Sequence, residues 1–370
     1  MRDKITIGVF LGILIVFLIG QLITKDRSYS NMESKSLITL SDFSIGEILN
    51  GDNSDILEAY LTDQILFKDS LVKTRNDSLD KMNITNINGV YIGEDGYLIK
   101  NFSKPGKELE DNIYEMKEFI KKQTVPCTFL MVPNSSYIYR DKLPKGADIY
   151  SQGLVIDKIQ EGIGGSVNFI DATDILEEHK DENIYFKTDQ NWTMDGAYYG
   201  YEALCKGLGI EVTPKENLVK AIGSDEFLGT LYSLAPISKQ EKDELIIYTN
   251  SNGEYKVDYI DKGTRSMSLM EYDYLKIKDK YKTFLCGNHS VVRISSNGLI
   301  DENVLIIKDS YANCLIPLLA DNFNEIHVMD LRYYTDNIDE YIEKNNIDRV
   351  IFIYNVDFFS WDNHFIELNN

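Results

Sequence analysis

Short apolar runs alternate with helical stretches along most of this chain, and that alternation limits the folds it can adopt. Compact apolar runs lie at residues 304–307, 326–329 and 350–354, and segments of helical period near 311–322 and 336–346 separate them. Strands that alternate with helices at this spacing predict a mostly parallel sheet with helices on both faces. The same pattern predicts earlier strands and helices, at 125–132 and 167–170 and at 109–122, 154–163 and 194–208 respectively. We therefore expect an α/β fold.

Other segments depart from this alternation. Residues 41–82 have helical period and predict a helical lead-in, whereas residues 89–102 predict a β-hairpin around a Glu-Asp-Gly turn. Residues 211–282 consist of short alternating segments and predict a β-rich insertion, and 283–286 predicts one more short strand. The expected organisation is one α/β domain over residues 41–370 that contains this insertion.

The N-terminal segment is apolar enough to cross a membrane. Residues 5–24 contain no charged side chain, and their length matches the hydrocarbon core of a bilayer. A cleaved signal peptide is the alternative, but the run is long for one and no small-x-small cleavage site precedes Lys25. The short tail favours a cytoplasmic N-terminus. We expect a membrane anchor at 1–27, a polar stalk at 28–40, and a single-pass protein of the cell membrane whose bulk is extracellular.

The charge and motif content narrow the classes of partner and cofactor. The net charge is −21, which argues against nucleic acid or anionic phosphate surfaces as partners because the protein would approach them against its own field. The four cysteines show neither a CxxC pair nor the spacing of a zinc site. The sequence contains no GxxxxGK[ST], HExxH or EF-hand motif. We expect no metal and no cofactor.

Polar clusters follow three of the predicted strands. Ser310 lies at the bend between a strand and a helix, Asp189 and Asn191 precede another helix, and Asn288 and His289 follow a third apolar run. Reactive groups of open α/β sheets gather at such strand ends. A serine at this bend presents its hydroxyl group beside backbone N–H groups that can form an oxyanion hole. The alternative is that Ser310 only caps the helix.

At these clusters the chain resembles a known family, the DHHW proteins of Gram-positive bacteria. The matching blocks, in order, are GVYIGEDGYLIK, TDQNWTMDGAYYGYEAL, FLGTLYS, FLCGNHS, LIIKDSYANCLIPLL and EIHVMDLRYY, and they span roughly residues 36–361. DHHW proteins are similar to alginate O-acetyltransferases and, more distantly, to SGNH hydrolases. The resemblance implies an SGNH-hydrolase-like fold and a part in the O-acetylation of a cell-envelope polysaccharide.

The resemblance also implies roles for individual residues. Ser310 matches the nucleophile, Asp189 matches the aspartate that orients the base, and Asn191 occupies the position of the base. The sequence departs from the family motif here, because Gln190 and Asn191 replace both histidines. An amide cannot accept a proton near neutral pH, and general-base assistance contributes about two to four powers of ten in rate. The expected enzyme therefore has a degenerate base position.

Further residues of the matching blocks are expected around this site. His289 is the candidate for a substitute base, and Asn288 resembles the oxyanion-hole asparagine of SGNH esterases. Arg332 resembles a substrate-side arginine of the family, with an ordinary salt bridge as the alternative. Tyr311 and Trp192 are candidates for stacking on sugar rings, with packing in the core as the alternative.

Two classes of function stay open at this point. The first is acyl transfer or ester hydrolysis on an extracellular polysaccharide. The second is a catalytically inactive relative that binds glycan or assists a membrane-bound O-acyltransferase encoded elsewhere.

Overall fold

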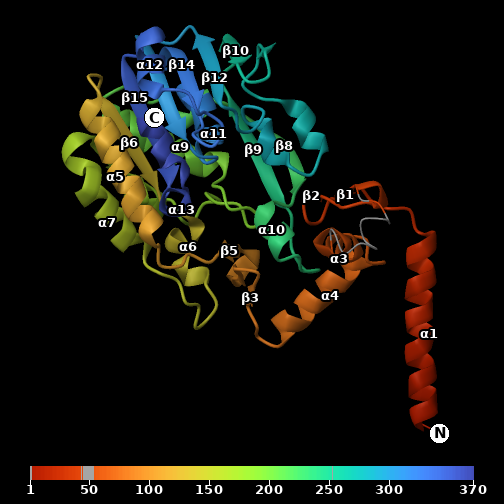
Figure 1. Ribbon diagram of the computed structural model, residues 1–370. Helices are drawn as coiled ribbons and strands as arrows, with labels where there is room; N and C mark the ends of the chain where they lie inside the picture. Colours follow the sequence, from red (N-terminus) through yellow and green to blue (C-terminus); the bar gives the residue numbers. More distant parts are fainter. Residues whose placement is uncertain (1, 43, 45–53, 252) are drawn as a thin grey trace.

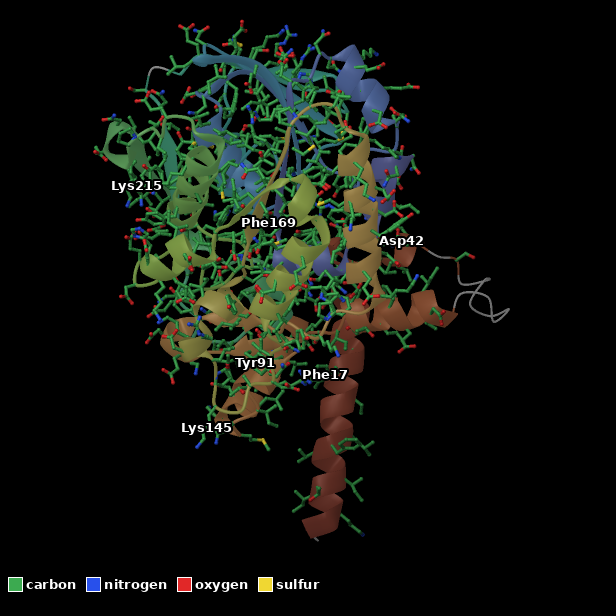
Figure 2. The ribbon with its side chains drawn as sticks, turned by 90° about the vertical axis from the view of Figure 1, so that its left-hand side faces the viewer. Phe17, Asp42, Tyr91, Lys145, Phe169 and Lys215 are labelled. Carbon is green, nitrogen blue, oxygen red and sulfur yellow. The ribbon has the colours of Figure 1, made fainter. Side chains whose placement is uncertain are left out.

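The computed structural model describes residues 2–42, 44, 54–251 and 253–370, and it consists of a long N-terminal helix joined to an α/β body (Figure 1). Helix α1 (Arg2–Ile23) extends away from the body. Figure 2 shows this helix, on which Phe17 is labelled. The body does not cover most of it, and its side chains project outward.

The body is built on a central sheet of eight strands among the described residues, and the sheet is mixed. Pairings from β14 to β7 are parallel, whereas those from β11 to β14 are antiparallel. The expected α/β fold is present, but its central sheet is mixed and not mostly parallel as expected. In their order across the sheet, the strands are β11 (Thr264–Ser266), β10 (Tyr255–Tyr259), β12 (Val291–Ser296), β14 (Phe323–Met329), β13 (Ile300–Lys308), β15 (Arg349–Asn355), β6 (Cys127–Val132) and β7 (Asn168–Asp171).

The parallel strands form because their residues are apolar on both faces, so each face can be covered by helices. Along β13, Val304 and Ile306 pack into one hydrophobic core, and Leu305 and Ile307 pack into the other. All four are fully buried. The first core includes residues of α9 (Met194–Leu208) and α11 (Ala312–Leu319), and the second includes residues of α5 (Lys107–Lys122), α7 (Gln152–Ile163), α12 (Ile338–Lys344) and α13 (Val356–Trp361).

The residues expected to form a β-rich insertion contain strands, but two of these strands extend the central sheet. β8 (Val219–Phe227) and β9 (Asp243–Thr249) pair with each other in a separate two-stranded sheet. β10 and β11 instead continue the central sheet through β12. The antiparallel half of the central sheet therefore comes largely from this segment.

The lead-in and the hairpin have the expected secondary structure where the structure describes them. The lead-in contains α3 (Ser54–Asp63) and α4 (Lys68–Lys81), whereas its residues 45–53 lie outside the described residues. β4 (Val90–Ile92) and β5 (Leu98–Lys100) form the hairpin, and β3 (Asn86–Ile87) joins it. The segment expected as a stalk contains a small hairpin of β1 (Tyr29–Ser30) and β2 (Lys35–Ser36). The remaining helices are α6 (Ser135–Ile138), α8 (Thr173–Glu178), α10 (Thr230–Leu234), η1 (Leu40–Asp42), η2 (Glu94–Gly96), η3 (Arg140–Lys142), η4 (Gly164–Ser166), η5 (Lys215–Asn217), η6 (Tyr272–Lys276), η7 (Lys280–Thr283) and η8 (His364–Asn369).

The strand expected at residues 283–286 is wrong. Leu285, Cys286 and Gly287 have φ angles of 53°, 58° and 89°, which a β-strand does not allow. The apolar residues of this segment are instead buried in a turn before β12. Asn288 and His289 thus precede a strand rather than follow one.

We predict that α1 anchors the protein in a membrane. Residues Lys4–Gln21 have a mean hydropathy of 2.1, and α1 is long and apolar enough to cross a bilayer. The full chain should stay in the membrane fraction after an alkaline wash and leave it in detergent. Substituting both Leu11 and Ile15 with Asp should reduce the membrane fraction, because each charge near the helix centre costs about 2.5–3.5 kcal/mol. Mature protein that begins near Lys25 and accumulates in the medium would instead show a cleaved signal.

Candidate active site

The carboxyl ends of the parallel strands meet at one edge of the central sheet, and polar residues follow each of them. Ser310 follows β13, Asn134 follows β6, Asn355 ends β15, and Asp330 follows β14. These strands are neighbours in the sheet, so residues far apart in sequence come together at this edge.

The turn that presents Ser310 is fixed by the buried carboxylate of Asp309. Its Oδ1 accepts a hydrogen bond from the backbone N–H of Tyr311 at 2.8 Å, and its Oδ2 accepts bonds from the backbone N–H and Nδ2 of Asn355 at 2.7 and 2.5 Å. Burial raises the pKa of Asp309 to about 7, against the opposing effect of these donors. Asp309 thus ties the turn after β13 to the end of β15.

Ser310, Asn191 and Asp189 form one line of hydrogen bonds. The Ser310 hydroxyl donates to Asn191 Oδ1 at 3.2 Å, and Asn191 Nδ2 donates to Asp189 Oδ1 at 2.6 Å. A carboxylate only accepts hydrogen bonds, so Asp189 fixes the amide with its oxygen toward Ser310. Asn191 and Asp189 are buried, whereas Ser310 is half-buried. The structure thus brings together three of the expected site residues.

A second loop supports Asp189 from behind. Its Oδ2 accepts a hydrogen bond from the backbone N–H of Thr230 at 2.8 Å. Gly229 makes this approach feasible, because a Cβ at that position would lie 2.3 Å from both Cβ and Oδ2 of Asp189. Residues of the block FLGTLYS therefore fix the position of the Asp189 carboxylate.

Trp192 and Tyr311 join the loop that carries Asp189 and Asn191 to the turn that carries Ser310. Neither side chain is accessible to a sugar. Trp192 Nε1 donates to the Tyr311 carbonyl at 2.8 Å, and the Tyr311 hydroxyl donates to the Gln190 carbonyl. The two side chains are 0% and 1% exposed, so the expectation that they stack on substrate is wrong and the packing alternative holds. Their indole and phenol groups bury large apolar surfaces while each polar atom finds a partner.

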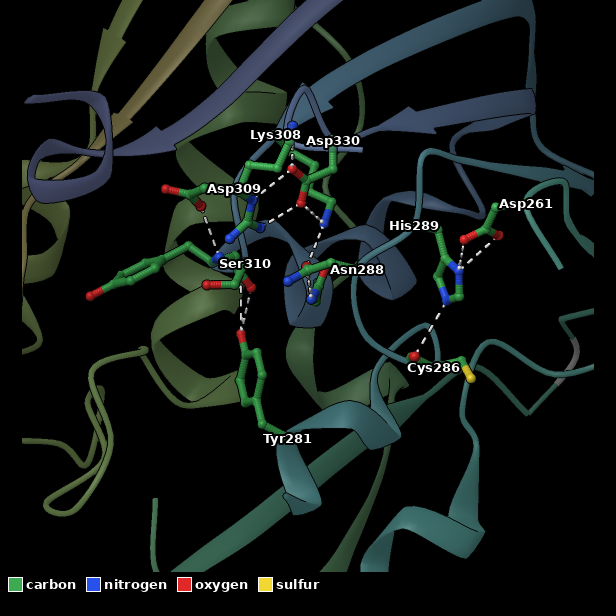
Figure 3. A network of polar contacts seen from close by, with 12 residues as sticks. Asp261, Tyr281, Cys286, Asn288, His289, Lys308, Asp309, Ser310 and Asp330 are labelled. Atoms are coloured by element: carbon green, nitrogen blue, oxygen red, sulfur yellow. Dashed lines mark hydrogen bonds and ion pairs between the residues drawn. The ribbon is translucent and has the colours of Figure 1, made fainter. Parts of the chain in front are cut away.

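The side-chain oxygen of Asn288 accepts two hydrogen bonds that fix its amide group. Its Oδ1 accepts hydrogen bonds from Lys308 Nζ at 2.8 Å and from Asn313 Nδ2 at 2.9 Å. Among the described residues, its Nδ2 has no partner. Asn313 also donates its backbone N–H to the Ser310 carbonyl at 3.2 Å, which places Asn288 against the Ser310 turn. Figure 3 shows Asn288 in this network. The three left-handed residues before Asn288 set its position, and such strained backbone commonly occurs at functional sites.

Lys308, Asp330 and Arg332 form an ion network next to Asn288, and Figure 3 shows its Lys308 and Asp330. Arg332 contacts Asp330 with two nitrogens, at 2.8 and 2.5 Å, and Lys308 Nζ lies 3.3 Å from Asp330 Oδ2. Burial lowers the pKa of Lys308, with Asp330 opposing that effect. Burial also acts to raise the pKa of Asp330, but the charges of Lys308 and Arg332 outweigh it and hold that pKa below its usual value. The salt-bridge alternative for Arg332 is present.

His289 does not join this line of residues. In the part of the chain that the structure describes, its Nδ1 lies 2.9 Å from an Asp261 carboxylate oxygen and its Nε2 lies 3.3 Å from the Cys286 carbonyl (Figure 3). Its side chain is 1% exposed, and neither ring nitrogen contacts Ser310. A base must lie within hydrogen-bond reach of the proton it removes. The geometry thus gives no support to His289 as the substitute base.

Sequence reasoning missed several residues that position the site. Lys308 and Asp309 directly precede Ser310 in the sequence. Two charged residues at the end of an apolar strand could have indicated that both are buried and paired near Ser310. Tyr281, whose hydroxyl donates to the Ser310 carbonyl at 3.0 Å, and the backbone of Thr230 gave no such signal. Their contacts depend on how loops pack against each other.

Comparison with known proteins confirms the family resemblance. Residues 152–329 match the family model described as DHHW protein. The crystal structure of a DHHW family protein from Eubacterium siraeum is similar, with a TM-score of 0.68 and 24% identity over 76% of this chain and 96% of that one.

Two further solved structures resemble the chain. Bacillus cereus PatB1 with a sulfonyl adduct has a TM-score of 0.64 and 22% identity, covering 74% of this chain and 96% of that one. The O-acetyltransferase domain of Pseudomonas putida AlgJ has a TM-score of 0.48 and 14% identity, covering 74% and 93%. No curated protein matches the chain. The likenesses to the Eubacterium siraeum protein and to PatB1 show a shared fold.

We predict that Gly229→Ala destabilises the protein by displacing Asp189. The backbone at Gly229 (φ −84°, ψ −161°) is open to alanine, so the effect arises from the added methyl group against a buried carboxylate. The free energy of unfolding should fall by about 1–3 kcal/mol. Urea unfolding followed by tryptophan fluorescence measures it. Gly165→Ala is the control, because nothing lies within 4 Å of its added Cβ. Equal stability of the two variants would contradict the close contact with Asp189.

Proposed function

We propose that this chain, whose residues 152–329 match the DHHW family, takes part in the O-acetylation of a cell-envelope polysaccharide. In this proposal Ser310 is the nucleophile position of an acyl-transfer site whose base has been replaced by Asn191. The protein is held at the outer face of the membrane by α1, and its own turnover is very slow.

The observation that carries this proposal is the line from Ser310 through Asn191 to Asp189. In acyl transfer, a serine Oγ attacks the ester carbonyl while a neighbouring base removes the hydroxyl proton. Asn191 Oδ1 accepts the hydrogen bond of that hydroxyl group, but an amide does not take up its proton near neutral pH. The arrangement keeps the geometry of the reaction but lacks the transfer of the Ser310 proton to a base.

The surroundings of Ser310 suit an acyl intermediate. The free Nδ2 of Asn288 is a hydrogen-bond donor beside the Ser310 turn, and Lys308 orients it by binding its Oδ1. Lys308 and Arg332 both pair with Asp330, so this donor is held by a fixed network. A preorganised donor stabilises the negative charge that develops on a carbonyl oxygen. These features support an ester substrate.

A second candidate function is a silent relative that binds glycan or assists a membrane-bound O-acyltransferase. The observation in its favour is that Asp189 fixes the Asn191 amide with its oxygen toward Ser310. Ser310 then has a hydrogen-bond acceptor but no base. The two candidates differ in whether Ser310 still forms an acyl bond.

We predict that Asn191→His raises the rate of acetyl-ester hydrolysis by about 10²–10⁴-fold, because it restores a proton acceptor between Ser310 and Asp189. The full chain in detergent is assayed with a chromogenic acetyl ester. The unmodified chain should turn over very slowly but faster than Ser310→Ala, whereas equal rates would favour the silent relative.

Two matched variants make this result specific. Asn191→Gln changes the side chain without adding a base, and Asn191→His combined with Ser310→Ala keeps the imidazole but removes the nucleophile. Both should lack the gain. Brisk turnover by the unmodified chain, or a gain that survives Ser310→Ala, would contradict the proposal.

We also predict that Asn288→Ala, introduced into Asn191→His, lowers the restored rate by about 10²–10³-fold, the usual effect of losing one oxyanion donor. His289→Gln in the same background is the control and should leave the rate near that of Asn191→His, because His289 bonds Asp261 and Cys286 instead. A greater loss with His289→Gln than with Asn288→Ala would reverse the assignment.

A further inference from the structure

A large cavity lies between the N-terminal lead-in and the body. It has a volume of about 980 Å³, and its lining comes from the segment around β1, from α4, from α10 and the residues before it, and from residues 276–282. Such a volume lies at the upper end of the range typical of ligand sites. The cavity is separate from the line of Ser310, Asn191 and Asp189, none of which lines it.

Lysines dominate the charged lining of this cavity. Three acidic residues, Asp69, Glu226 and Asp279, also line it, and each already pairs with a cation: Arg27, Lys242 and Lys282 respectively. The six lysines of the lining are Lys73, Lys242, Lys276, Lys278, Lys280 and Lys282. In a protein of net charge −21, this is a local excess of positive charge.

Three of the lysines have no carboxylate partner. Lys73, Lys278 and Lys280 form no ion pair with any residue that the structure describes. Lys73 and Lys278 both lie over the ring of Tyr232, at 5.7 and 5.2 Å from its centroid, and the positive charge of Lys73 acts on Lys278. An anion bound beside both lysines would offset this repulsion.

The charge of Lys278 depends on its surroundings. Burial lowers its pKa to about 8, with a smaller contribution from Lys73, whereas Asp189 and Asp279 oppose this shift. A bound anion would favour the charged form of Lys278 and raise its pKa again. Occupancy by an anion is therefore coupled to the protonation of this lysine.

The lysine segment also contacts the candidate active site. Tyr281 lies between Lys280 and Lys282 in the chain, and its hydroxyl donates to the Ser310 carbonyl (Figure 3). Lys278 donates to the carbonyl of Leu228, one residue before the Gly229–Thr230 pair that holds Asp189. A polymer lying in the cavity would thus come close to the Ser310 turn.

We infer that this cavity binds the anionic groups, phosphate or carboxylate, of a polysaccharide and guides that polymer toward Ser310. This inference rests on the proposed function and names its substrate class. Lys73, Lys278 and Lys280 bind the anion. The net negative charge of the protein repels the anionic polymer, so the polymer binds at the lysine-lined cavity and not elsewhere on the surface.

The test is polymer binding by the full chain in neutral phosphatidylcholine nanodiscs. Fluorescently labelled polygalacturonate, poly(glycerol phosphate) and neutral dextran of matched length serve as probes, and anisotropy measures binding. The combined variant Lys73→Gln, Lys278→Gln and Lys280→Gln should weaken binding of an anionic polymer by about tenfold. Binding should also weaken between about 50 and 500 mM NaCl and between pH 7 and 9. The carboxylate and phosphate polymers identify which anion is preferred.

The control variant replaces Lys104, Lys145 and Lys344 with Gln, three exposed lysines outside the cavity that also lack an ion pair with any described residue. It removes the same charge and should bind like the unmodified chain. Equal losses in both variants, or equal binding of dextran, would overturn the inference. So would competition by short-chain phosphatidylglycerol with no binding of either polymer, since the site would then take a lipid headgroup.

Binding is measured without turnover, so this inference and the proposed function can fail separately. An inactive Asn191→His variant whose polymer binding still depends on the three lysines contradicts only acyl transfer. An active Asn191→His variant with no lysine-dependent binding contradicts only the anionic substrate.

Discussion

The site depends on a reciprocal pair of hydrogen bonds between two buried aromatic residues. Trp192 donates to the Tyr311 carbonyl, and Tyr311 donates to the Gln190 carbonyl, so the loop that carries Asp189 and Asn191 is fastened to the turn that carries Ser310. Gly200 allows the indole to fit, because a Cβ there would lie 2.4 Å from the Trp192 ring. The position of Asn191 relative to Ser310 follows from this contact, whatever side chain residue 191 carries.

That arrangement explains how the site keeps its shape without a histidine. An amide has a donor nitrogen and an acceptor oxygen, and a neutral imidazole likewise has one donor and one acceptor nitrogen, so Asn191 satisfies both Asp189 and Ser310. The buried acid keeps a partner, and no unpaired charge is left to destabilise the fold. In the proposed function, this substitution removes proton transfer from Ser310 while leaving the surrounding packing intact.

Charge is distributed unevenly around this site. The chain as a whole is acidic, but Lys308 and Arg332 lie behind Asn288, and a lysine-lined cavity adjoins the loops that hold Ser310 and Asp189. The acidic surface argued against anionic partners when only the sequence was considered. The fold changes that argument, because Lys73 and Lys242 lie in one surface with the four lysines of residues 276–282.

The sequence predicts the parts of this structure that depend on local pattern. The parallel strands are apolar runs buried on both faces, and α9 spans the residues 194–208 that its helical period predicts. The segment before Asn288 was mispredicted because buried apolar residues read alike in a strand and in a turn. His289 was misplaced for the same reason, since a strand there would have carried it to the edge near Ser310.

The antiparallel half of the sheet and the lysine-lined cavity depend on contacts between distant segments, which a single sequence does not reveal. Trp192 and Tyr311 show the same limit. Their residue types fit a sugar-binding surface equally well, and only the three-dimensional packing shows that they bind each other.

The central claim is that Ser310 is correctly placed and lacks only a base. The most direct measurement is the pH dependence of Ser310 labelling by a sulfonyl fluoride, compared between the unmodified chain and Asn191→His. The account predicts that labelling of Asn191→His rises with pH and levels off above about pH 7, as an imidazole loses its proton. The unmodified chain should react slowly with no such plateau. A plateau in the unmodified chain over the same range would contradict the account, because another group would then be acting as the base.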